Sequence, residues 1–394
     1  MTARIHGTCA PGFEGVREEF ERNFTERGDL GASVAATVDG EFVVDLWGGD
    51  ADRTGTRAWE RDSLVNVYST TKGMTALGAH LLADRGELDL DAPVARYWPE
   101  FAQEGKADIP VRWLLSHRSG VFAPHEPLTS QDLYDWDKVC GVLAATPPWW
   151  KPGSVQGYHA VSYGYLVGEV VRRITGVSLG TFLRAEVTGP LGADVYVGTP
   201  ESEHARCANM VRPVASDGAA NAADSATPPA PPVRSIDDHP LAPITLAMQY
   251  LPIENVNGAA YRCAEIPAAN GHASARGLAK VYAALGGGKL LGESALERLR
   301  TRQSEPDERD LVLGAMTAWG EKWEWGLGYM LNLYGQAGPN PRAFGHGGMG
   351  GSYAFADPEN RVAYAYVMNQ MGGGTSGEDL RSVHLVGALY RALR

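Results

Sequence analysis

The chain carries the stretch Asn66-Val67-Tyr68-Ser69-Thr70-Thr71-Lys72-Gly73-Met74, which runs into the apolar helical pattern of residues 77–82. Ser and Thr before such a pattern are typical of a helix start, so Ser69 is expected near a helix N-terminus. Residues three apart on a helix are neighbours, which brings the Lys72 amine beside the Ser69 hydroxyl. A desolvated lysine with a lowered pKa can take the proton of an alcohol and make it a nucleophile. The alternative is that Ser69 only caps the helix and Lys72 is solvated, because S-x-x-K spacings are common.

A second candidate group lies in the stretch Trp149-Trp150-Lys151-Pro152-Gly153-Ser154-Val155-Gln156-Gly157-Tyr158-His159-Ala160. A helix is predicted over Val161–Thr175, with Gly176 at its C-cap, so Tyr158 stands in a loop just ahead of it. From there Tyr158 could reach the Ser-Lys pair. Beside an ammonium the pKa of the phenol is expected to fall, which would let Tyr158 act as base and then as acid. The alternatives are a core tyrosine with a satisfied hydroxyl, and a Trp150 that is packed instead of lining an acyl pocket.

A third candidate is the glycine-rich stretch Gly345-His346-Gly347-Gly348-Met349-Gly350-Gly351-Ser352. Glycines let a backbone approach a ligand closely, and the N–H groups of such a strand edge can stabilise a developing oxyanion. The alternative is a tight turn that only connects two strands and has no role in binding or catalysis. The glycines also fit a dinucleotide-binding spacing, but a strand follows them and no parallel unit precedes them, so we set that interpretation aside.

The pattern along the chain is mixed α/β, then helical, then mixed α/β. An amphipathic helix is predicted from Phe13 to about Gly28, a hairpin around Asp39-Gly40, a second hairpin around residues 357–360, and a closing helix over Glu378–Arg394. We therefore predict an α/β (mixed α+β) fold: an antiparallel sheet with flanking helices, formed by residues 1–87 and 265–394. Residues 88–264 form an inserted helical lobe, with a Pro-rich surface excursion at 214–243.

Composition excludes several classes of function. The net charge of −12 argues against nucleic-acid and anionic-membrane partners, and no apolar run is long enough to span a membrane. The N-terminal residues lack the apolar core of a secretory signal, and four widely spaced cysteines favour reduced thiols, so we expect a cytoplasmic protein. The chain has no metal-ligand spacing such as HExxH and no GxSxG elbow, so we expect neither a metal, nor another cofactor, nor an α/β-hydrolase.

Taken in order, S-x-x-K, a Tyr after a Pro-Gly turn, and His-Gly-Gly before a strand resemble the serine β-lactamase and penicillin-binding-protein superfamily. The chain is most similar in this respect to class C β-lactamases and the family VIII carboxylesterases. The family resemblance extends to three further stretches, residues 83–94, 114–120 and 190–193. The second of these contains His117, for which the resemblance implies a structural role rather than a catalytic one.

The resemblance implies roles for individual residues. Ser69 corresponds to the nucleophile, Lys72 to its activating lysine and Tyr158 to the tyrosine of the second motif. The N–H groups of Ser69 and Met349 would form the oxyanion hole. His346, Gly347 and Gly348 stand where β-lactamases have Lys-Thr-Gly, and with Trp150 are expected to bind substrate.

Two departures favour the esterase branch of the superfamily. Ala160 stands where β-lactamases of this type carry Asn, and His346 replaces the lysine that holds the antibiotic carboxylate; Arg342 and Arg361 are candidates to replace that charge. We therefore predict a serine carboxylesterase that cleaves small-molecule esters through a Ser69 acyl-enzyme. The alternatives are an acyltransferase, a weak β-lactamase or DD-peptidase, or a catalytically silent binding protein; homo-oligomers are left open.

Overall fold

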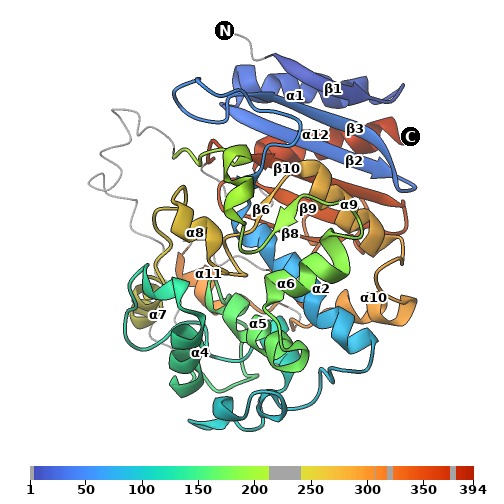
Figure 1. Ribbon diagram of the computed structural model, residues 1–394. Coiled ribbons are helices and arrows are strands. Elements are labelled where there is room, and N and C mark those ends of the chain that lie inside the picture. Colours follow the sequence, from blue (N-terminus) through green and yellow to red (C-terminus); the bar gives the residue numbers. More distant parts are fainter. Residues whose placement is uncertain (1–3, 213–240, 306, 317–322, 373–378) are drawn as a thin grey trace.

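The computed structural model describes residues 4–212, 241–305, 307–316, 323–372 and 379–394. One antiparallel sheet combines strands from both ends of the chain, in the order β1-β3-β2-β10-β9-β8-β7 (Figure 1). The N-terminal strands are β1 (Ile5–Cys9), β2 (Gly31–Val38) and β3 (Glu41–Gly49). The C-terminal strands are β7 (Met330–Leu331), β8 (Phe344–Gly347), β9 (Tyr353–Asp357) and β10 (Val362–Met368). β2 and β10 join the two ends over the register Val38↔Val362 to Ala32↔Met368.

Helices cover both faces of this sheet. Tyr364 of β10 contacts Ser382 of α12 (Leu380–Ala392), which packs on α1 (Glu14–Glu26). Ala356 of β9 lies against Gly286 of α9 (Ala275–Gly286). Ala356 pairs with Ala363, the neighbour of Tyr364, so α9 and α12 lie on opposite faces because side chains alternate along a strand. Strands β2 and β10 are accordingly apolar and buried over almost their whole length.

Helix α2 (Thr71–Asp84) connects the sheet with the helical part of the protein. All residues from Thr71 to Leu82 are buried, because α2 contacts β8 on one side and α5 and α6 on another. A helix that is buried all round needs small and apolar side chains on every face, which the sequence from Gly73 to Leu82 supplies. Figure 1 shows α2 running from the sheet into the helical part.

The remaining elements lie mostly between α2 and α9 in the chain. The helices are α3 (Val111–Leu115), α4 (Trp136–Ala145), α5 (Ser162–Thr175), α6 (Leu179–Leu183), α7 (Leu241–Ala247), α8 (Ala259–Cys263), α10 (Glu293–Leu299) and α11 (Leu311–Met316). Short 3-10 turns include η1 (Tyr68–Thr70). A second, small sheet has the order β4-β6-β5, with β4 (Val65–Asn66), β6 (His272–Ala273) and β5 (Val195–Tyr196).

The predicted fold class is confirmed, as are the opening helix, both hairpins, the helix that ends at Gly176 and the closing helix. The inserted lobe is not wholly helical, because Val195 pairs with Ala273. The division at residues 87/88 and 264/265 stays a prediction. Most of the proposed Pro-rich excursion, residues 214–240, lies outside the described residues.

We predict that the packing of α2 carries much of the stability. Leu77 is fully buried in α2, so Leu77→Ala should lower the free energy of unfolding by about 2–5 kcal/mol through lost transfer energy and a cavity. Val177 is 41% exposed, and Val177→Ala is the matched control with an effect within about 0.5 kcal/mol. Urea denaturation followed by circular dichroism measures both. Equal effects of the two substitutions would contradict this role of α2.

Candidate active site

The turn that presents Ser69 is held by side chains on either side of it. Tyr68 has a φ of +44°, a strained value for a non-glycine residue. Asn66 Oδ1 accepts a hydrogen bond from the Tyr68 N–H at 3.0 Å, and Thr71 Oγ1 donates to the Tyr68 carbonyl at 2.5 Å. These bonds fix the turn η1 at the start of α2, with Ser69 half-buried at the wall of a pocket.

Lys72 is fully buried beneath Ser69, and its surroundings determine its charge. Its Nζ lies 3.0 Å from Ser69 Oγ, 2.7 Å from the Ala160 carbonyl oxygen and 3.0 Å from the Ala268 carbonyl oxygen. Burial lowers the pKa of Lys72 well below its ordinary value. A neutral amine has two hydrogens and one lone pair. Because carbonyls only accept, they take both hydrogens, and the lone pair is left for the Ser69 hydroxyl.

Tyr158 lies on the other side of Ser69. The two side chains are hydrogen-bond partners, and the Lys72 Nζ lies 4.7 Å from the centre of the Tyr158 ring. Burial raises the pKa of Tyr158, and the hydrogen bond with Ser69 opposes this only partly. The expected fall in this pKa is therefore wrong: the phenol is desolvated, and the amine beside it is itself buried, which disfavours its ammonium form. Tyr158 is a neutral O–H donor in the resting site.

The glycine-rich stretch lies directly against the Ser69 turn. A Cβ on Gly348 would lie 2.1 Å from the Val67 carbonyl oxygen, and the Ser352 hydroxyl donates to that same oxygen at 2.8 Å. Only glycine permits this approach. Within the described part of the chain, no acceptor takes the backbone N–H of Ser69 or of Met349. Both N–H groups therefore stay available to a substrate oxygen.

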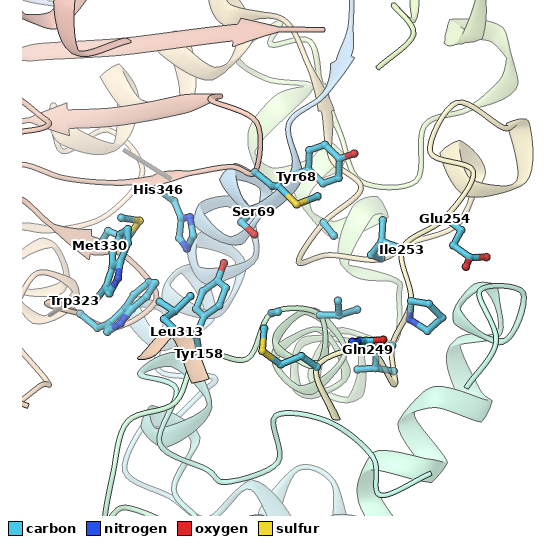
Figure 2. A pocket seen from close by; sticks show the side chains of 18 of the residues that line it. Tyr68, Ser69, Tyr158, Gln249, Ile253, Glu254, Leu313, Trp323, Met330 and His346 are labelled. Atoms are coloured by element: carbon cyan, nitrogen blue, oxygen red, sulfur yellow. The ribbon is translucent and has the colours of Figure 1, made fainter. Parts of the chain in front are cut away.

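His346 faces the same space from β8. Figure 2 shows the Ser69, Tyr158 and His346 side chains around one cavity. His346 Nδ1 donates to the Gly347 carbonyl at 2.7 Å, and burial lowers the pKa of His346 to about 3. His346 is thus a neutral imidazole with its Nε2 free of protein partners among the described residues. A neutral ring cannot replace the positive charge of a lysine at this position.

The pocket in front of Ser69 has a volume of about 670 Å³ and a mainly apolar wall. The pocket is lined from the helical part by Val161, Met248, Leu251 and Ile253, and from the other side by Leu313, Trp325, Met330 and Met349. Arg212 and Glu254 are the charged side chains that reach it among the described residues (Glu254 is labelled in Figure 2).

Other predicted residues lie elsewhere. Trp150 is buried in a separate apolar cluster and stacks on Phe122 at 5.6 Å between ring centroids, so it is not part of the described pocket wall. Arg342 pairs with Glu297 and Glu359, and Arg361 with Asp39, so both arginines are engaged away from the pocket.

Sequence reasoning missed Trp325, whose ring stacks on Tyr158 at 5.5 Å between centroids. The repeated Trp and Gly of residues 323–328 were a signal for it. It also missed the carbonyls of Ala160 and Ala268, and no residue type could have indicated those.

Three further expectations concern cysteines, membranes and metals. Cys9, Cys140, Cys207 and Cys263 are free thiols. Across the described ranges, no helix has the length and apolar character needed to cross a membrane. The same ranges contain no group of three or more His, Cys, Asp or Glu side chains arranged to hold a metal ion.

The chain belongs to the β-lactamase family, whose model matches residues 20–388. This agrees with the fold and with the placement of the S-x-x-K pair, the tyrosine and the glycine-rich strand around one pocket.

The chain is also similar to individual proteins of this family. The chain is 37% identical over 380 residues to the esterase/beta-lactamase LipL of Mycobacterium tuberculosis, covering 93% of this chain and 83% of that protein. It is 41% identical to a family VIII carboxylesterase of known crystal structure, with a TM-score of 0.86 over 99% of this chain and 100% of that one. A penicillin-binding-protein homologue from Caulobacter crescentus is 39% identical, with a TM-score of 0.84 over 99% of this chain and 100% of the other.

We predict that the neutral amine of Lys72 is needed for activity. Below its lowered pKa the amine is protonated and cannot accept the Ser69 proton, so kcat/KM should fall as the pH falls through that value. Lys72→Arg, which stays charged, should lose about 10²–10⁴-fold in kcat/KM at every pH. The pH dependence of p-nitrophenyl butyrate hydrolysis measures both effects.

Lys106 supplies the matched control for this prediction. It is also buried, with a pKa lowered to about 8 by desolvation, and it donates to the Thr146 carbonyl away from the pocket. Lys106→Arg should keep the wild-type rate and pH profile. A Lys72→Arg variant with the wild-type rate would rule out a proton-accepting Lys72.

Proposed function

We propose that this protein is a serine carboxylesterase that cleaves small-molecule esters through an acyl-enzyme on Ser69. The observation that carries the proposal is the buried Lys72 amine, whose Nζ lies 3.0 Å from Ser69 Oγ and within 3.0 Å of the Ala160 and Ala268 carbonyl oxygens. In its neutral form this amine gives its two hydrogens to the carbonyls and keeps its lone pair for the Ser69 hydroxyl. The similarity to an esterase and to a family VIII carboxylesterase supports the same activity.

Acylation follows from the positions of three side chains. Ser69 Oγ attacks the ester carbonyl carbon while Lys72 Nζ takes its proton. When the carbon–oxygen bond to the alcohol breaks, the leaving oxygen takes the proton of the Tyr158 hydroxyl. The Lys72 ammonium then returns a proton to Tyr158, so both groups regain their neutral forms.

Deacylation reverses these roles with water as the nucleophile. Water passes a proton to the Tyr158–Lys72 pair, attacks the acyl carbon and releases the acid, and Ser69 recovers its proton. In both steps the oxyanion is placed between the N–H groups of Ser69 and Met349. Two such donors in a water-poor site typically contribute several kcal/mol to the stability of the transition state.

The pocket supports an apolar ester substrate. Its wall is mainly aliphatic and aromatic, and its volume of about 670 Å³ exceeds what a short acyl chain needs. The free thiols agree with a reducing, cytoplasmic compartment, which we also propose.

Hydrolysis of β-lactams is the second candidate, because a relative carries both activities in its name. The neutral His346 disfavours it, since the antibiotic carboxylate would find no cation at that position. Initial rates with a chromogenic cephalosporin, compared with a p-nitrophenyl ester, test this candidate. Acyl transfer is tested by adding butanol and measuring the ratio of butyl ester to free acid.

We predict that Ser69→Ala abolishes both turnover and acyl-enzyme formation. Intact-protein mass spectrometry after brief mixing with p-nitrophenyl butyrate should show the mass of one butyryl group, mapped to the Ser69 peptide. Ser116→Ala is the control, because that buried serine bonds to the Arg112 carbonyl outside the pocket. A Ser69→Ala enzyme that turns over ester at the wild-type rate would contradict the proposed function.

A further inference from the structure

The loop that carries Tyr158 is held from two sides through its backbone. The Gly157 N–H donates to the His117 carbonyl at 2.9 Å, and the His159 N–H donates to His117 Nδ1 at 3.2 Å. From the opposite side, Glu308 Oε1 accepts the Gln156 N–H and Asp310 Oδ1 accepts the Tyr158 N–H, both at 2.9 Å. Four consecutive N–H groups are thus used to position one side chain.

The two holding segments are also joined to each other. Arg118, next to His117, forms a 2.8 Å ion pair with Glu308, and both side chains are largely buried. His117 has a φ of +61°, a conformation that needs such support from its surroundings. The Tyr158 loop is therefore clamped between two segments that are bonded together.

Asp310 is the centre of this arrangement and is fully buried. Besides the Tyr158 N–H, its Oδ1 accepts the N–H groups of Val312 and Leu313 at 3.0 and 2.9 Å, at the start of α11. Its Oδ2 accepts from Gln156 Nε2 at 3.3 Å. No cation pairs with it among the described residues, so only hydrogen bonds oppose the cost of burying it, and burial still raises the pKa of Asp310.

This position gives Asp310 two effects on the reaction. It ties Tyr158 to α11, whose Leu313 lines the pocket, so the proton donor and the pocket wall share one anchor. Its negative charge also opposes ionisation of the phenol, which raises the pKa of Tyr158. Among the described residues, the other ionisable or polar groups near Tyr158 include Ser69, Lys72, His117, Tyr163, Trp325 and His346.

We propose that Asp310 is a positioning residue: through the Tyr158 N–H it holds the Tyr158 hydroxyl where it delivers a proton to the leaving alcohol. The inference rests on the proposed function, because it assumes that Tyr158 is that donor. The positioning role predicts a difference between ester substrates with different leaving groups. An alkyl alcohol leaves only with a proton, whereas p-nitrophenol leaves readily as its anion.

The test compares Asp310→Ala with wild type on ethyl butyrate and p-nitrophenyl butyrate. We expect kcat/KM, which reports acylation alone, to fall about 10²-fold for ethyl butyrate, the effect of a misplaced catalytic group, and at least tenfold less for p-nitrophenyl butyrate. Asp310→Asn keeps an oxygen for the Tyr158 N–H, and its amide can donate to Gln156 Oε1, which has no partner among the described residues. Asp310→Asn should therefore recover most of the activity.

A double mutant separates positioning from a general structural effect. In the Tyr158→Phe background, Asp310→Ala should change kcat/KM for ethyl butyrate less than about threefold, because the group through which Asp310 acts is gone. If Asp310→Ala does not fold, Asp310→Ser replaces it, since a shorter side chain can cap α11 but reaches Tyr158 less well. Asp84→Ala, which removes a carboxylate from the Gly292 N–H near α10, is the matched control and should leave both substrates unaffected.

The outcomes distinguish this inference from the proposed function. Equal losses on both esters, or losses that add fully to those of Tyr158→Phe, would overturn the positioning role and leave the esterase assignment intact. Wild-type turnover by Ser69→Ala would overturn the proposed function and this inference with it.

Discussion

The burial of one amine is the constraint on which the rest of the site depends. Lys72 brings together three separate parts of the chain: Ser69 at the start of α2, the Ala160 carbonyl ahead of α5 and the Ala268 carbonyl ahead of β6. An ammonium in this place would lose its hydration without gaining a carboxylate, so the neutral form is favoured. In the proposed mechanism, the neutral form makes Lys72 the proton acceptor. The packing of α2 between the sheet and the helical part is what keeps water away from it.

Burial also favours the uncharged forms of the side chains around Lys72. Burial lowers the pKa of His346 to about 3 and raises that of Tyr158, so each rests in its uncharged form. In the proposed mechanism, charge develops only during the reaction, on the substrate oxygen and on Lys72. The N–H groups of Ser69 and Met349, which we propose as the oxyanion hole, would already be in place for that charge, because the glycine-rich strand is packed against the Ser69 turn. The clamp around Tyr158 would extend this preorganisation to the proposed proton donor.

The sequence allowed most of the framework to be predicted, for reasons that are local. Asp39-Gly40 specifies a hairpin turn, Gly176 ends a helix, and Ser69 and Lys72 are three residues apart on one helix face. The contributions that escaped prediction are long-range. The Ala160 and Ala268 carbonyls carry no signal in their side chains, and Asp310 is separated from Tyr158 by 152 positions. From the sequence alone, an ammonium on Lys72 predicts a lowered pKa for Tyr158, and only the burial of both side chains reverses that prediction. Trp150 is the opposite case, a residue that the sequence predicted in the site and the structure places outside it. It lies near a catalytic motif in the sequence, but its side chain packs in a separate apolar cluster instead of lining the pocket.

The most direct test of the account is the titration of Lys72 itself. The chain has seven lysines, so ¹³C labelling at their ε carbons would give few NMR signals to follow with pH. The signal absent from a Lys72→Met variant belongs to Lys72. We predict that this signal titrates well below the ordinary lysine pKa; the Lys106 signal, expected to titrate near pH 8, is a second buried lysine for comparison. A Lys72 signal that titrates at the ordinary value would show an ammonium under Ser69 and would contradict the central claim.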